Sequence, residues 1–107
     1  MSWSISYHPA ALEDLKRLDG SQKKQVLKAI QKVSANPLPY NEGGYGKPLG
    51  NKSGNNLSNL LKIKLRQSGI RVVYDLVRNK NDMCIIVIGI RADNEVYRIA
   101  GQRIKTK

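Results

Sequence analysis

Apolar and polar side chains first alternate along the chain and then recur at helical spacing. Residues 2–7 alternate serine with large apolar side chains, which is typical of a half-buried strand. Pro9 suits the first position of a helix, and apolar positions continue at helical spacing as far as Leu18. Asp19-Gly20 then interrupts the pattern. These residues predict a strand followed by a short amphipathic helix.

A second helix is predicted between Ser21, as an N-terminal cap, and Asn36-Pro37, because a residue before proline leaves the helical region. Its apolar positions follow the i, i+3, i+4, i+7 rule: Val26, Ala29, Ile30 and Val33. The two helices are expected to form a hairpin.

Residues 37–56 carry five glycines and three prolines and show no sustained hydrophobic period. We therefore expect a long surface loop there. Gly46-Lys47 within it resembles part of a phosphate-binding loop. The full motif fails, however, because position 41 is Asn41 and Pro48 follows the lysine.

Strand patterns dominate from residue 57 onward. Residues 61–66 alternate apolar with cationic side chains, residues 70–77 are rich in β-branched residues, and residues 83–90 are almost continuously apolar. Residues 67–69 suit a hairpin connection, and the apolar spacing of residues 93–104 predicts a last helix. The order β, α, α, β, β, β, α predicts an α+β fold with a three- to four-strand, mostly antiparallel sheet.

Length and composition set limits on this fold. At 107 residues the chain is expected to form one domain, residues 1–107. The single cysteine, Cys84, cannot form an internal disulfide and is expected to be a small core residue. The longest apolar run, residues 83–90, is too short to span a membrane, and no signal peptide is evident. A reduced, cytoplasmic setting is therefore expected.

The net charge of +11 is the largest compositional signal, and residues 62–107 carry +7 of it. An anionic partner is expected, and nucleic acid, an acidic protein and an anionic membrane surface all remain open on charge alone. One histidine and one cysteine cannot supply a zinc site, and the scattered acidic residues suggest no magnesium-dependent nuclease. His8, beside Pro9, is expected to lie at a helix entry.

Cationic side chains form one recurring pattern in the C-terminal half. Lys62, Lys64 and Arg66 would form a row along one strand face, with successive residues of the row about 6.6 Å apart. A hairpin at residues 67–69 would bring Arg71 near this row, and Arg91 follows the apolar strand. Such a row could follow a phosphodiester chain, although a solvated strand face is the commoner meaning of the same spacing.

The segment KIKLRQSGIRVVY, residues 62–74, resembles the central motif of the RelE-type toxins in the RelE/ParE toxin–antitoxin superfamily. Residues 89–91 (GIR) and 95–97 (EVY) are similar to the closing segments of that family, and residues 9–15 and 47–49 fit its wider pattern. The resemblance spans nearly the whole chain. It implies a single RelE-like toxin domain that enters the ribosomal A site and cleaves messenger RNA there.

The resemblance also implies which side chains would do the chemistry. The catalytic positions of the family fall on Lys62, Lys64, Arg71, Arg91 and Tyr97. Arg66 matches a further basic position that would bind RNA.

Metal-free RNA cleavage uses the 2′-hydroxyl as nucleophile and needs a base, cations around the phosphorane and an acid for the departing 5′-oxygen. Lys64 is the candidate base and Arg91 the candidate acid. Lys62 and Arg71 would stabilise the phosphorane, and Tyr97 would stack on or orient a substrate base. No cofactor is required.

Two other functions remain open: a ParE-like inhibitor of DNA gyrase, and a non-enzymatic RNA-binding module. The gyrase-directed branch is not expected to need the Lys/Arg/Tyr set. The family resemblance further implies a cognate antitoxin, besides the ribosome with its 16S rRNA, and contact with operator DNA only through that antitoxin. No membrane partner is expected.

Overall fold

The computed structural model describes residues 3–52, 55–90 and 93–105. The helices and strands follow one another along these ranges as β1 (Ser4–Tyr7), α1 (Pro9–Lys16), α2 (Gly20–Ser34), β2 (Lys47–Lys52), β3 (Asn55–Leu65), β4 (Ile70–Val77), β5 (Asp82–Gly89) and α3 (Asp93–Lys105). Two short 3₁₀ turns lie at Tyr40–Glu42 and Arg78–Lys80. Within these ranges, no helix is long and apolar enough to cross a bilayer.

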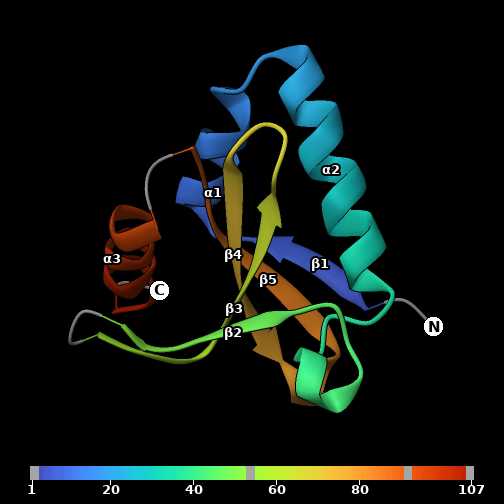
Figure 1. The fold of residues 1–107 in the computed structure, drawn as a ribbon, viewed down its shortest axis with the longest axis vertical. Helices are drawn as coiled ribbons and strands as arrows, with labels where there is room; N and C mark the ends of the chain where they lie inside the picture. The colour runs from blue at the N-terminus through green and yellow to red at the C-terminus, as the bar shows by residue number, and fades with distance from the viewer. Residues whose placement is uncertain (1–2, 53–54, 91–92, 106–107) are drawn as a thin grey trace.

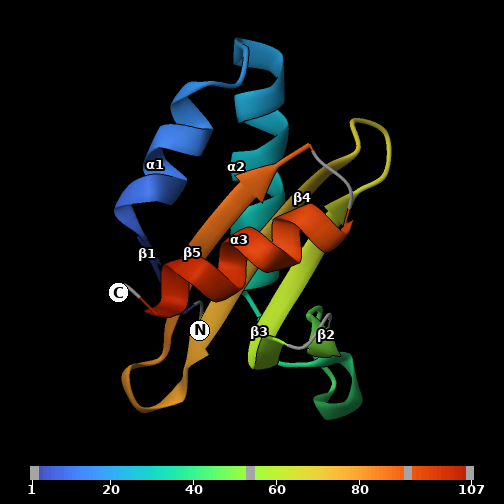
Figure 2. The same ribbon diagram turned by 90° about the vertical axis from the view of Figure 1, so that its left-hand side faces the viewer.

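The strands form one mixed sheet in the order β1-β5-β4-β3-β2. The β1 strand is parallel to β5, whereas the other neighbouring pairs are antiparallel. Helices α1 and α2 cover one face of the sheet and α3 covers the other (Figures 1 and 2). The predicted α+β fold is confirmed, with five strands in the described residues in place of the expected three or four.

The two N-terminal helices begin with side-chain caps. His8 caps α1, because its Nδ1 accepts a hydrogen bond from the Ala10 amide at 3.0 Å, which confirms the expected role at a helix entry. Asp19, and not Ser21, caps α2, and its carboxylate accepts from the Gln22 amide at 2.8 Å. Gln22 returns a bond to the Asp19 amide, which completes a capping box. Ser21 fails as the cap because the helix has already begun at Gly20.

Each face of the sheet has its own apolar cluster. Under α1 and α2 the buried members are Ala11, Val26, Ile30, Val33, Leu61, Ile70, Val72, Tyr74, Met83, Ile85 and Ile88. Under α3 they are Leu49, Leu60, Val73, Cys84, Ile86, Val87, Val96, Tyr97 and Ala100. Both β4 and β5 contribute side chains to both clusters. The prediction from the apolar run at 83–90, a strand buried on both faces, is confirmed for β5.

The expected loop at residues 37–56 is partly wrong. Residues 47–52 form β2 and residues 55–56 begin β3, and these two strands pair antiparallel. The pairing is made by main-chain groups, while the side chains are mostly polar or glycine, so no hydrophobic alternation marks it. A register shift between Pro48 and Gly50 further breaks the two-residue period.

Residues 37–46 are fixed to the sheet by a buried tyrosine. The Tyr74 hydroxyl donates to the Pro37 carbonyl oxygen at 2.7 Å, and burial raises the pKa of this phenol. Gly46 lies against the same hydroxyl and against the Leu61 side chain, so a Cβ at this position would overlap both. The glycine that suggested a phosphate-binding loop therefore has a packing role.

We expect Tyr74→Phe to lower the free energy of unfolding by about 1 to 2 kcal/mol. The ring would stay packed, but the Pro37 carbonyl would lose the donor that the structure gives it. Urea denaturation of both proteins measures the change. Tyr40→Phe is the matched control, because Tyr40 is 68% exposed and its change should be close to neutral. Equal losses in the two variants would contradict this account of Tyr74.

Candidate active site

Three of the predicted cationic residues share the sheet face that α3 covers. Ile63 and Leu65 pack into the cluster under α1 and α2, so the alternate residues Lys62 and Lys64 point to the α3 side. Arg71 on β4 lies directly opposite Lys64 on β3, and opposed residues of an antiparallel pair share a face. The sheet therefore brings these three cations together from two neighbouring strands.

Lys62 contacts Tyr97, which comes from α3. The Lys62 ammonium donates to the Tyr97 hydroxyl oxygen at 2.7 Å. The same ammonium lies 5.5 Å from the centre of the Tyr97 ring. These two distances place the ammonium beyond the hydroxyl end of the ring, so the contact is a hydrogen bond and not a cation above the ring face. Tyr97 thereby fixes the end of a flexible lysine side chain.

The Tyr97 ring is only 3% exposed, because it packs in the apolar cluster beneath α3. Stacking of this ring on an RNA base, one of the two roles expected from the sequence, is incompatible with that burial. The alternative role, orientation through the hydroxyl, fits the contact with Lys62. A tyrosine at an apolar helical position can thus serve in the core and at the site at once.

Arg71 and Lys64 differ in how they are held. One guanidinium nitrogen of Arg71 donates to the Gly69 carbonyl at 3.0 Å, within the turn that joins β3 to β4. Gly69 has a φ of 73°, in the left-handed region that glycine adopts readily, and this conformation helps to close the turn. The Lys64 side chain is exposed. The site therefore combines an anchored guanidinium with a more accessible amine.

Lys47 is a fourth cation on this face that the sequence interpretation missed. It lies on β2 directly opposite Lys62 on β3, and its side chain is exposed. The loop expected at residues 37–56 concealed this placement, since only strand pairing brings Lys47 beside the row. The Lys47-Pro48-Leu49 segment, which fits the wider family pattern, was the available signal.

Arg66 does not join the other cations. β3 ends at Leu65, so Arg66 lies in the turn and lines a groove of about 450 Å³ with Lys28 and Lys32 of α2. The expected row of three cations along one strand is therefore wrong at its last member. Arg91, the candidate acid, lies outside the described residues.

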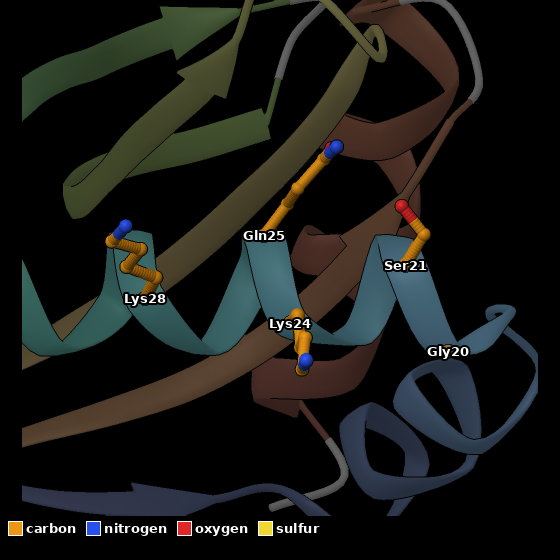
Figure 3. Close-up of a pocket in the computed structure, with 5 residues that line it drawn as sticks. All are labelled: Gly20, Ser21, Lys24, Gln25 and Lys28. Atoms are coloured by element: carbon orange, nitrogen blue, oxygen red, sulfur yellow. The ribbon is translucent and has the colours of Figure 1, made fainter.

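A broader hollow runs along α2, away from this cluster. It is lined by Gly20, Ser21, Lys24, Gln25 and Lys28 (Figure 3). α2 covers the face of the sheet opposite α3 (Figures 1 and 2), so the hollow and the cations of the α3 face are separated by the sheet. We place the chemistry with the cations, because they come with a hydroxyl partner and with opposed strand positions.

The arrangement suits a phosphate diester. We define the cationic face as Lys47, Lys62, Lys64 and Arg71. Three ammonium groups offer mobile point charges, whereas the guanidinium offers a planar fork that matches phosphate oxygens. Positive groups converging on a developing negative charge are the usual device for stabilising a phosphorane.

Comparison with known proteins gives one consistent result. The family model described as "ParE toxin of type II toxin-antitoxin system, parDE" matches residues 5–97. The mRNA interferase toxin RelE of Escherichia coli K12 is 29% identical over 104 residues, which cover 97% of this chain and 99% of that protein.

Solved structures agree with this likeness. The crystal structure of the isolated E. coli RelE toxin aligns with a TM-score of 0.70 at 27% identity, and covers 96% of this chain and 99% of that one. A mutant of E. coli RelE in complex with a peptide of the antitoxin RelBc aligns with a TM-score of 0.71 at 26% identity, over 94% of this chain and 95% of that one.

Proposed function

Because this chain belongs to the family of ParE toxins of type II toxin–antitoxin systems, and is similar to the mRNA interferase toxin RelE, we propose that it is a ribosome-dependent endoribonuclease. It would cleave messenger RNA in the ribosomal A site and thereby stop translation. The observation that carries the proposal is the cationic face, where Lys62, Lys64 and Arg71 lie on neighbouring strands beside the Tyr97 hydroxyl.

The proposed reaction is attack of a ribose 2′-oxygen on the adjacent phosphorus, with release of the 5′-oxygen. Lys64 is assigned as the base because its amine is accessible and it lies directly opposite Arg71. A lysine accepts a proton only through its neutral amine, so the base role belongs to that form of the Lys64 side chain.

The other assigned residues stabilise charge. Arg71 and Lys62 would contact the phosphorane oxygens, and Tyr97 would hold Lys62 in place through their hydrogen bond. Arg91 is assigned as the acid for the departing 5′-oxygen. The leaving alkoxide is a far stronger base than neutral guanidine, so even a guanidinium can give it a proton. No step in this scheme uses a metal ion.

Partners follow from the same proposal. The chain would bind the 16S rRNA and messenger of the ribosome through its cations. It would also bind a cognate antitoxin, as the RelE mutant named above binds an antitoxin peptide. An acidic antitoxin would offset the net charge of +11 in the resting cell. Operator DNA would be contacted through that antitoxin.

A reconstituted translation system tests this function directly. Purified chain is added to ribosomes stalled on a defined messenger, and the new RNA ends are mapped. We expect cuts in the A-site codon that leave a cyclic phosphate and a free 5′-hydroxyl. A messenger with a deoxynucleotide at the cut position should stay intact, because it lacks the attacking oxygen. Cleavage of that messenger would contradict the proposed chemistry.

The family description favours one second candidate, inhibition of DNA gyrase, because ParE names the matching family. A supercoiling assay run beside the translation assay separates the two functions. Loss of supercoiling with intact messenger would replace the ribonuclease proposal. Salt-sensitive RNA binding without new ends in either assay would instead indicate a non-enzymatic RNA-binding module.

A further inference from the structure

Among the described residues, no strand pairs with the end of β5 on the side where β1 lies. β1 pairs with β5 only from Asp82 to Ile85, whereas β5 continues to Gly89. Side chains form hydrogen bonds with the backbone of β5 at this open edge. Arg103 of α3 donates to the Ile86 carbonyl at 2.9 Å, and Asp14 of α1 accepts from the Ile88 amide at 3.1 Å. These contacts satisfy backbone groups that an open sheet edge would leave unpaired.

The same two side chains form an ion pair. Arg103 donates to the two oxygens of the Asp14 carboxylate, at 2.7 and 3.3 Å. The side chains are only 19% and 11% exposed, in contrast to 55% and 42% for the Arg78–Glu42 pair. A shielded, two-pronged pair is geometrically demanding, so it fixes the distance and the orientation between α1, β5 and α3.

Apart from this pair, α3 also packs on the sheet through apolar contacts. Val96, Tyr97 and Ala100 pack into the cluster beneath the helix. Apolar burial is not directional, so it resists a small slide or rotation of a helix less than an ion pair does. Tyr97 lies six residues before Arg103 on one continuous helix, a separation of about 9 Å along the axis. A shift at Arg103 would therefore carry Tyr97 with it.

We propose that the Asp14–Arg103 pair is a positioning device for the candidate active site. It sets α3 on the sheet so that the Tyr97 hydroxyl meets the Lys62 ammonium. The predicted effect on RNA cleavage rests on the proposed function. The predicted effects on the position of α3 and on the Lys62–Tyr97 contact are independent of that function.

Cys84 provides a built-in probe of α3. It is the single cysteine of the chain, is 7% exposed, and belongs to the cluster beneath the helix. We expect Arg103→Gln to raise the rate at which an aromatic disulfide reagent labels Cys84 by about tenfold or more, through local opening. Arg98→Gln is the matched control, since Arg98 is an exposed arginine of the same helix, and its rate should stay within about twofold.

Tyr74→Phe separates local opening from general destabilisation. It weakens the protein on the opposite face of the sheet, so Cys84 labelling should change far less than in Arg103→Gln. The claim that the ion pair holds α3 on the sheet would be overturned by either of two results. In one, Arg103→Gln is labelled at the wild-type rate; in the other, its labelling rate follows global stability alone.

Positioning of Tyr97 needs its own measurement. In the RNA cleavage assay, Arg103→Gln should lower kcat about tenfold when Tyr97 is present and less than about twofold in a Tyr97→Phe background. Arg103→Lys should recover part of the loss, because it restores one charged contact to Asp14. Equal losses in both backgrounds would overturn positioning, since a merely structural role predicts them.

If the wild-type chain cleaves no RNA, the proposed function fails, but the positioning proposal can still be tested. The test is then a double-mutant cycle that measures stability. The coupling between Lys62→Met and Tyr97→Phe is measured by urea denaturation, with Arg103 present and with Arg103→Gln. Loss of the coupling in Arg103→Gln supports the proposal. Coupling that persists there overturns it.

Discussion

Changing Lys62 and Lys64 together to alanine is expected to lower the rate of messenger cleavage by at least about 10³-fold. The change removes the assigned base and one of the cations assigned to the phosphorane. Because Lys64 is exposed and Lys62 only partly buried, the fold should be retained. Single-turnover cleavage on stalled ribosomes measures the rate, and circular dichroism confirms that the variant is folded.

The matched control removes the same charge from the other side of the sheet. Lys24 and Lys28 line the hollow along α2 in Figure 3, and changing both to alanine lowers the net charge equally. We expect this control to keep cleavage within about tenfold of the wild-type rate, as weaker steering of RNA predicts. Equal losses in the two double variants would mean that total charge, and not the cationic face, governs activity. Full activity of Lys62→Ala with Lys64→Ala would remove both assignments.

Much of the fold could be predicted because packing and periodicity agree along the second half of the chain. The alternation of Ile63 and Lys64 predicted which face of β3 packs under α1 and α2, and Leu61, Ile63 and Leu65 all pack into that cluster. The nearly unbroken apolar run of β5 predicted a strand buried on both faces. In β2 the side chains show no hydrophobic periodicity, so the prediction from periodicity failed there. Strand pairing made only by backbone groups does not require a particular side-chain pattern.

The candidate site could be predicted in part for a related reason. Lys62, Lys64 and Arg71 follow strand geometry, so their shared face was evident from spacing and a turn. Lys47 required knowledge of a strand pairing that lies outside any local pattern. Arg66 was misplaced because the strand ends one residue earlier than its alternation suggested. The Asp14–Arg103 pair joins residues 89 positions apart, and no spacing rule could have found it.

The assigned role of Lys64 requires it to accept a proton, and a positive charge alone does not meet this requirement. The variant Lys64→Arg separates proton acceptance from charge. The variant keeps the positive charge and the exposed position. Before the reaction begins, a guanidinium is fully protonated at accessible pH, so it has no free site to accept the 2′-hydroxyl proton. We expect the cleavage rate to fall by about 10² to 10⁴-fold, while binding of the chain to ribosomes changes little.

Lys62→Arg is the conservative counterpart on the same strand. Lys62 is assigned a stabilising role, and a guanidinium can also serve this role by donating hydrogen bonds to phosphate oxygens. The fall in cleavage rate in Lys62→Arg should therefore be much smaller than in Lys64→Arg, even though the larger group must fit next to the Tyr97 hydroxyl. If Lys64→Arg instead cleaves at the wild-type rate, the proton acceptor is another group, and the cations of β3 act only by holding the phosphate.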